Sequence, residues 1–137
     1  MVLLEFGKED ASYLAEANTD SLRLEKEVRQ MELQDMLRGT NDTSDAIVNI
    51  NSGAGGTEAQ DWAQMLLRMY IRYCEHMGFK TQIVDTLTGE EAGIKSATFT
   101  VQGEYAYGFL SAEIGVHRLV RVSPFDSNQR RHTSFAS

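Results

Sequence analysis

The sequence is poor in cysteine and proline, with one residue of each, and it has no long apolar run. The single cysteine, Cys74, cannot form an internal disulfide, and without a second cysteine a thiolate zinc cluster and a CxxC redox pair are excluded. The apolar runs are only a few residues long, whereas a membrane-spanning helix needs roughly 20 residues. The start, MVLLEFGKED, lacks a basic segment followed by a long apolar core. The sequence therefore predicts a cytoplasmic protein without a membrane segment.

What is present is typical of a folded domain. The 137 residues suit one compact domain, alone or with an appendage, and leave little room for two full cores. Hydrophobic residues make up 42% and charged residues 24%, close to globular averages. This composition excludes a largely disordered or collagen-like chain.

The charge is distributed unevenly along the chain. The net charge of −7 argues against a nucleic-acid partner, because a phosphate backbone is bound by neutralising it with Lys and Arg. Residues 117–137, however, hold four arginines and one aspartate, which gives +3, and they also contain His117 and His132. The acidic total therefore hides a basic C-terminal end.

The spacing of apolar residues predicts a helix over residues 21–38. Asp20 and Ser21 can cap its start, and Gly39 follows its end as a C′ glycine should. The run GTNDTSD, over residues 39–45, is dense in turn formers and predicts a boundary.

This boundary divides the chain into two parts. Residues 1–40 form a helical segment, in which residues 1–20 are either a second helix or a partly ordered tail. Residues 46–137 form the main domain, and no internal repeat is found.

The first half of the main domain predicts a strand, a turn and a helix. Residues 46–51 are strand-like and stop at the glycine-rich segment 52–56. Thr57 and Gln60 form a T-x-x-Q capping box for a helix that ends at Gly78. The apolar stripe of this helix, which we predict to face the core, consists of Trp62, Met65, Leu66, Met69, Tyr73 and Met77.

The second half predicts two strand pairs around a short helix. Residues 79–87 and 94–102 form the first pair, joined by TGEEAG, and residues 104–113 form the helix. Residues 116–122 and 130–135 form the second pair, with the loop SPFDSNQ between them. This order predicts an α+β domain with a mixed or antiparallel sheet packed by helices on one face, preceded by the α-helical segment.

The glycine-rich turn before the long helix is the first candidate site. Backbone N–H groups at a helix start suit phosphate or another acceptor. The segment GAGGTE has neither the Gly-Lys-Ser/Thr of a P-loop nor the G-x-G-x-x-G spacing of a dinucleotide fold. A tight turn that simply needs glycines is the alternative.

The histidines do not predict a catalytic or metal site. His76, His117 and His132 lack the helical i, i+3 or i+4 spacing of metal ligands, and no G-x-S-x-G nucleophile setting is present. We therefore expect no catalytic residue, no metal and no cofactor.

The loop after VHRLVRV is a candidate site for reading single-stranded nucleic acid. Ser123, Pro124 and Phe125 combine a hydroxyl donor and acceptor, a fixed backbone and a stacking face. His132 and Thr133 sit across the same hairpin end. The alternative is an ordinary hairpin loop whose phenylalanine folds back onto the core.

Three motifs carry a resemblance to a known family. The segments GAGGTEAQDW, YAYGFLSAEIGVHRLVRVSPFDS and RRHTSF closely resemble the bacterial peptide chain release factor 2 family, with a match over residues 24–137. The resemblance implies that residues 1–40 correspond to the end of that family's helical first domain. It implies that residues 46–137 correspond to part of its codon-recognition domain.

The resemblance also implies roles for the hairpin residues. The tripeptide Ser123-Pro124-Phe125 corresponds to the stop-codon discriminator of a family that accepts UAA and UGA. Adenine N6 is a donor and guanine O6 an acceptor, and a rotating serine hydroxyl can pair with either. By the same resemblance His132 stacks between codon bases, and Thr133 gives a hydroxyl to the third base.

The glycine-rich turn receives a role from the resemblance as well. Gly55, Gly56 and Glu58 correspond to the helix tip that recognises the first uridine. Backbone N–H donors there would pair with uracil O4 but would meet another donor, the N4 amino group, on cytosine.

The resemblance has one departure that bears on activity. The family hydrolyses peptidyl-tRNA with a Gly-Gly-Gln tripeptide, whereas the only Gly-Gly pair here, Gly55-Gly56, is followed by Thr57. We therefore expect codon recognition without hydrolysis, so this chain is not an enzyme by itself. The implied partners are the ribosome, through its decoding-site rRNA, and the mRNA stop codon, with no membrane and no small-molecule substrate.

Two other functions stay open at this point. One is a stand-alone regulatory or adaptor protein that binds the ribosomal factor site without hydrolysis. The other is a nucleotide-using enzyme built on GAGGTE. The family's domain also takes elements from elsewhere in the full protein, so we expect an uncovered sheet edge or helix face and a tendency to self-associate.

Overall fold

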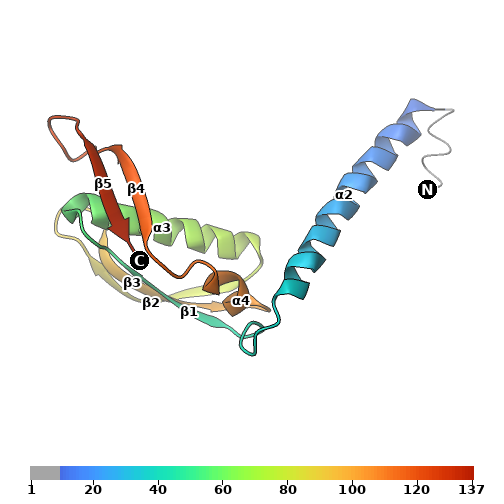
Figure 1. Cartoon of the computed structure of the whole chain (residues 1–137), viewed down its shortest axis with the longest axis horizontal. Coiled ribbons are helices and arrows are strands. Elements are labelled where there is room, and N and C mark those ends of the chain that lie inside the picture. Colours follow the sequence, from blue (N-terminus) through green and yellow to red (C-terminus); the bar gives the residue numbers. More distant parts are fainter. Residues whose placement is uncertain (1–9) are drawn as a thin grey trace. The chain divides into compact units, whose positions relative to one another are not determined.

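The structure, a computed structural model, describes residues 10–137. It divides into two compact units, Met1–Arg38 and Gly39–Ser137 (Figure 1). Among the described residues no helix is long and apolar enough to cross a membrane.

The first unit consists of one helix, α2, over Ala11–Met36. Its N-cap is Asp10, whose side chain accepts from the Ser12 backbone N–H at 2.9 Å. The predicted cap at Asp20 or Ser21 is therefore wrong, because the helix continues without a break through that point. Of the two alternatives for residues 1–20, residues 11–20 belong to this same helix, and residues 1–9 lie outside the described residues.

The end of α2 also differs from the prediction. The C-cap is Leu37, whose N–H bonds to the Gln34 carbonyl, and Gly39 lies two residues further on. The Gly39 N–H donates to Asp42 Oδ2 at 2.8 Å, so this glycine belongs to the turn that follows and not to the helix end. Within its own unit α2 buries only Ala17, and its predicted apolar stripe, including Leu24 and Met31, is exposed.

The second unit is an α+β domain, as the sequence predicts. Its elements in chain order are β1 (Ala46–Asn51), α3 (Gly56–His76), β2 (Lys80–Thr88), β3 (Ile94–Gln102), α4 (Ala106–Ser111), β4 (His117–Val122) and β5 (Arg131–Ala136). Strands β1, β3 and β2 form an antiparallel sheet in that order, and β4 and β5 form a separate two-stranded antiparallel ribbon. One isolated bridge, between Ser52 and Ala136, links the ribbon to the end of β1.

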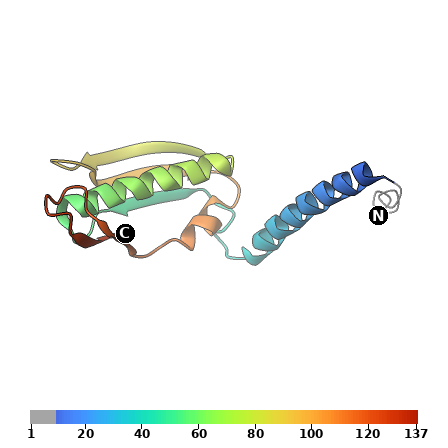
Figure 2. The same ribbon diagram turned by 90° about the horizontal axis from the view of Figure 1, so that it is seen from above.

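The core lies between the three-stranded sheet and α3, which runs across one face of it (Figure 2). Alternate residues of the central strand β3, among them Ala97, Phe99 and Val101, point into this core and are at most 1% exposed. Leu66 and Tyr70 of α3 are buried against them. The period-two pattern of β3 thus gives the sheet an apolar face against which α3 packs.

The apolar stripe predicts the buried face of α3 only in part, since Leu66 is buried and Trp62 packs against the core. Met65, Met69 and Tyr73 are 41%, 47% and 37% exposed. The buried side chains lie about one residue further round the helix and are Glu58, Ala59, Ala63, Leu66, Leu67, Tyr70 and Cys74. Small alanines at this face let the helix approach the sheet closely, which a ranking of residues by hydrophobic size does not anticipate.

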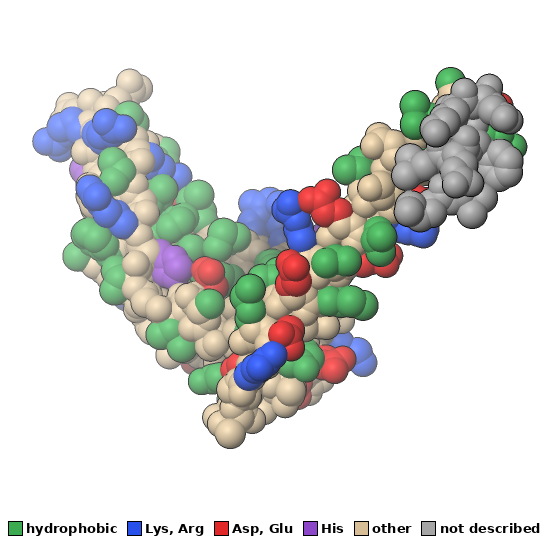
Figure 3. Space-filling view, turned by 45° about the vertical axis from the view of Figure 1, so that its right-hand side comes forward, with side chains coloured by type: hydrophobic (Ala, Val, Ile, Leu, Met, Phe, Trp, Pro, Cys, Tyr) green, Lys and Arg blue, Asp and Glu red, His purple; other side chains and the backbone are tan. Residues whose placement is uncertain are grey.

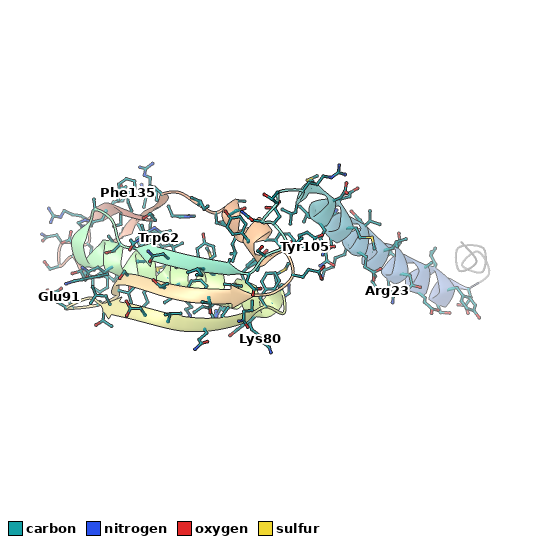
Figure 4. The ribbon with its side chains drawn as sticks, turned by 90° about the horizontal axis from the view of Figure 1, so that it is seen from below. Arg23, Trp62, Lys80, Glu91, Tyr105 and Phe135 are labelled. Carbon is teal, nitrogen blue, oxygen red and sulfur yellow. The ribbon has the colours of Figure 1, made fainter. Side chains whose placement is uncertain are left out.

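The predicted capping box of α3 is also absent. The N-cap is Gly55, which offers no side-chain hydrogen bond. The Thr57 hydroxyl instead donates to Glu91 Oε2 at 3.3 Å. Glu91 belongs to the turn between β2 and β3, which lies near this end of α3 (Figure 4). The N–H groups of the first turn of α3 are therefore left without a side-chain cap.

Candidate nucleic-acid interface

The loop between β4 and β5 is closed by backbone hydrogen bonds. The Ser123 N–H donates to the Arg130 carbonyl at 3.2 Å, and the Gln129 N–H donates to the Asp126 carbonyl at 3.0 Å. Gln129 has a left-handed backbone with φ of 51°. These bonds fix the position of Ser123 at the end of the paired strands, where the predicted reading tripeptide begins.

Ser123 is tied to the first turn of α3. Its side chain is buried, and Oγ donates to Glu58 Oε2 at 2.8 Å while accepting from the Phe125 N–H at 3.2 Å. The structure thus brings together two residues that the sequence assigns to the site from segments 65 positions apart. The hydroxyl proton is engaged by a carboxylate, which can only accept.

Glu58 is held ionised by an arginine of β4. Arg121 Nε donates to Glu58 Oε1, and Arg121 Nη2 donates to Asp61 Oδ2 at 2.6 Å. The hydrogen bond from Arg121 lowers the pKa of Glu58 despite its burial, with a smaller contribution from Ser123. The same bond raises the pKa of Arg121. The carboxylate therefore binds the ribbon to α3 and positions the loop at once.

A second carboxylate organises the other side of the loop. Asp126 Oδ2 lies 2.7 Å from His132 Nε2 and accepts from Arg130 Nε at 2.9 Å, and Asp126 Oδ1 accepts from the Asn128 N–H at 2.9 Å. The hydrogen bond with His132 is the main reason why the pKa of Asp126 is lowered. The His132 ring is thereby held against the loop between β4 and β5.

The remaining tripeptide residues are open to solvent. Pro124 is exposed, and Phe125 is 45% exposed. The alternative in which the phenylalanine folds back onto the core is therefore wrong. Both residues present their surfaces at the tip of the ribbon, beside the buried Ser123.

His132 and Thr133 lie on opposite faces of β5. His132 is half-buried on the face toward α3, opposite Arg121, and Thr133 is exposed on the other face, opposite Val120. This follows from the alternation of side chains along a strand. Of the two residues, the structure brings only His132 into the network around Ser123.

The glycine-rich turn packs directly against β5. The Gly53 N–H donates to the Phe135 carbonyl at 2.7 Å, and the Phe135 N–H donates to the Ala54 carbonyl at 3.2 Å. Gly55 has φ of 127°, and a Cβ there would lie 2.9 Å from Ser134 Oγ. Gly56 has φ of 58°, so both glycines use conformations that other residues avoid. The turn that is predicted to contact the first codon base therefore lies beside β5, which contains residues predicted to contact the later bases.

Several residues of the site are missed by sequence reasoning. Arg121, Asp61 and Asp126 form the ion pairs that position the loop, and the buried Ser134 hydroxyl has no hydrogen-bond partner among the described residues. The alternation in VHRLVRV places Arg121 on the same face as His117 and Leu119, which is a signal for the arginine. Nothing local indicates which carboxylate it meets.

His117 serves the packing of the ribbon. Its carbonyl accepts from Trp62 Nε1 at 3.0 Å, and its ring lies edge-on to Tyr70 (Figure 4 labels Trp62). Within residues 10–137 no group of three or more His, Cys, Asp or Glu could hold a metal ion. Ser123, Phe125 and His132 offer groups for hydrogen bonding and ring stacking.

Comparison with known proteins gives a consistent family. The PCRF domain matches residues 2–137. Peptide chain release factor 2 of a Nitratiruptor species is 55% identical over 130 residues, which is 95% of this chain and 35% of that protein. Peptide chain release factor 2 of Thermosipho africanus is 57% identical over 129 residues, 94% of this chain and 35% of that protein.

A solved structure agrees with these relatives. RF2 of Thermus thermophilus superimposes with a TM-score of 0.79 at 50% identity, covering 98% of this chain and 38% of that chain. The chain therefore spans a little over a third of the length of the proteins that it resembles.

Proposed function

The chain belongs to the PCRF-domain family of peptide chain release factors, and from this premise we propose that it recognises the stop codons UGA and UAA in the ribosomal decoding site. It would do so as the codon-recognition part of a release factor 2 and act in the cytoplasm, where the ribosome is. The observation that carries the proposal is the bond between Ser123 and Glu58, which joins the reading tripeptide to the helix tip.

The second codon base would be read by Ser123. In the free protein its hydroxyl donates to Glu58, so its remaining lone pair suits a donor such as adenine N6. Guanine O6 is an acceptor, and pairing with it requires the hydroxyl to rotate away from Glu58. The proposed acceptance of both bases thus depends on the Ser123 hydroxyl proton, which can be donated either to Glu58 or to guanine O6.

The other bases would be read by neighbouring groups. The uncapped N–H groups near Gly55 and Gly56, with Glu58 in the same turn, suit uracil O4 at the first position. Phe125 and His132 offer rings for stacking, and Thr133 offers a hydroxyl to the third base. Pro124 restricts the backbone of the exposed loop.

The ribosome would supply most of the binding free energy. Stacking is worth about 1–3 kcal/mol per base, and a chain with a net charge of −7 has little attraction for a free phosphate backbone. The proposed partners are therefore decoding-site rRNA and the mRNA stop codon together. The proposal involves no cofactor and no small-molecule substrate. It also involves no hydrolysis by this chain, in which Gly55-Gly56 is followed by Thr57 and not by glutamine.

A termination assay tests this function. The chain's residues are placed in a complete release factor, and peptide release is measured at UGA, UAA and UAG. We expect release at UGA and UAA but not at UAG. By resemblance, the related decoder that reads UAG instead of UGA has Pro-x-Thr at this tripeptide. Replacing Ser123-Pro124-Phe125 by Pro-Ala-Thr should therefore move the preference toward UAG, whereas the control Glu90→Ala, in the exposed β2–β3 turn, should leave it unchanged. An equal response to all three codons, or no change after the replacement, would contradict the proposal.

A second candidate is an adaptor that occupies the ribosomal factor site without triggering release. The two functions are distinguished by whether the reading frame continues into a domain that carries this tripeptide.

A further inference from the structure

The β4–β5 ribbon has two faces of different character. One face packs toward α3 and contains Arg121, His132 and the buried Ser134. The other face, which we call the outer ribbon face, is exposed and consists of Arg118, Val120, Val122, Arg131, Thr133 and Phe135. None of the contacts described for the reading loop uses its side chains.

The register gives this face a regular layout. Arg118 lies opposite Phe135, Val120 opposite Thr133, and Val122 opposite Arg131. The two arginines therefore occupy diagonal corners, roughly 13 Å apart along the ribbon, since a strand rises by about 3.4 Å per residue. Thr133 lies between them.

The two arginines differ from the other arginines of the ribbon and its loop. Arg121 pairs with Glu58 and Asp61, and Arg130 pairs with Asp126. Arg118 and Arg131 form no ion pair and no side-chain hydrogen bond with any residue of the described part of the chain. Figure 3 shows Lys and Arg side chains beside hydrophobic ones on the arm that the ribbon forms.

The apolar members of the face are exposed as well. Val122 is 56% exposed, Val120 39% and Phe135 36%. The face carries no acidic side chain, in a chain whose net charge is −7. Unpaired guanidinium groups beside an exposed ring complement a nucleic-acid strand, with phosphates for the first and a base for the second.

We infer that the outer ribbon face binds the messenger RNA strand that continues past the third base of the stop codon. The inference rests on the proposed function, in which Thr133 contacts that base. Because Thr133 lies on the outer face between Arg118 and Arg131, a strand held at Thr133 crosses this face as it leaves the codon. The arginines bind its phosphates, and Phe135 offers a surface for a base.

The test compares two messenger RNAs. The 137-residue chain, labelled at its N-terminus, is titrated with ribosomes that hold UGA in the decoding site, and fluorescence anisotropy gives the Kd over a range of salt concentrations. One mRNA ends at the third base of the codon, and the other continues for about six nucleotides. We expect tighter binding and a steeper salt dependence with the longer mRNA.

The variants assign the difference to the outer face. Arg118→Gln with Arg131→Gln should remove the advantage of the longer mRNA and reduce the slope of log K against log salt by about 1.4, or about 0.7 for each lost phosphate contact with a single strand. Arg118→Lys with Arg131→Lys should keep most of the slope. Arg68→Gln, an exposed α3 arginine, is the matched control and should change neither value.

Two results would overturn the inference. The unaltered chain could bind both mRNAs equally, or the double Gln variant could weaken binding to both mRNAs to the same extent, which would place the arginines on rRNA or on a ribosomal protein. The double Gln variant should keep the preference for UGA over a sense codon. If the unaltered chain lacks that preference, the proposed function itself fails and the inference fails with it.

Discussion

Glu58 is the residue on which the position of the β4–β5 loop depends. Its buried carboxylate accepts from both Arg121 and Ser123, so Glu58→Gln exchanges an ionic contact for a neutral one and leaves Arg121 with Asp61 alone. We expect a loss of about 2 kcal/mol in the free energy of unfolding, the scale of a hydrogen bond to a charged group. Urea denaturation measures it. Glu75→Gln, at an exposed position of the same helix, should cost less than about 0.5 kcal/mol.

The same carboxylate makes stability depend on pH. The pKa of Glu58 is lower in the folded chain than its ordinary value of 4.5, so its contribution is present above that value and is lost as the pH falls below it. Thermal unfolding of the unaltered chain should therefore lose stability more steeply below about pH 4.5 than that of Glu58→Gln. Identical acid limbs for the two proteins would contradict this assignment. Asp126, whose pKa is also lowered, contributes in the same direction in both.

At the residue scale the sequence predicts which functional groups the loop contains better than it predicts which side chains contact one another. The hydroxyl, proline and ring of Ser123-Pro124-Phe125 are evident from the sequence, and Phe125 is exposed in the structure. The pairing of Arg121 with Glu58 is not visible, because it depends on how α3 lies against β4, which no local pattern encodes. Alternation along β5 predicts that His132 and Thr133 lie on opposite faces, but it does not predict which of them faces α3.

At the scale of elements, β1 has an open edge through which we expect the chain to self-associate. Asn51 exchanges both backbone hydrogen bonds with Ser137, at 2.6 and 2.9 Å, so its N–H and C=O point away from β3. Alternation then directs those of Ile47 and Asn49 to the same edge, where no further backbone bond is formed among the described residues. Beside this edge lies a groove lined by apolar residues such as Leu66, Leu110 and Val116.

Proline substitution tests which backbone N–H groups of β1 point to the open edge. Asn49→Pro removes an N–H that points to the open edge, so it should unfold at nearly the same urea concentration as Asn49→Ala. Val48→Pro removes an N–H directed at β3, and it should be less stable than Val48→Ala by more than about 1 kcal/mol. Equal losses at the two positions would show that the edge is assigned wrongly. Asn49→Pro should also reduce the self-association expected of an uncovered edge, measured by sedimentation.

Element bounds follow from the sequence where the period is strong. The bounds of β1 and β3 agree with the predicted residues 46–51 and 94–102, because both strands alternate or are apolar throughout. The face of α3 follows only in part, since the prediction includes the buried Leu66 but places exposed methionines on this face in preference to the buried alanines. The start of α2 is missed because residues 11–20 have helical propensity without a clear apolar period.

At the scale of the whole molecule, the two units differ in the interactions that stabilise each of them internally. Helix α2 buries only Ala17 and has exposed ion pairs such as Glu25 with Arg29, at 2.6 Å, which contribute little. Within its own unit such a helix is stabilised mainly by helix propensity. Gly39–Ser137 has a core between sheet and helix. We expect the amides of α2 to exchange with solvent much faster than those of β3, as measured by hydrogen exchange with mass spectrometry.

The division also bears on where the proposed codon contacts lie. All the residues proposed to contact the codon lie in Gly39–Ser137, while residues 1–38 hold five basic and nine acidic side chains and so contribute −4 of the total of −7. Removing residues 1–38 should leave the thermal transition of the remaining unit unchanged and keep its preference for UGA over a sense codon on programmed ribosomes. Its affinity should be equal or higher, since less negative charge opposes approach to RNA. A truncated chain that folds but no longer distinguishes the codons would show that the helical unit takes part in reading them.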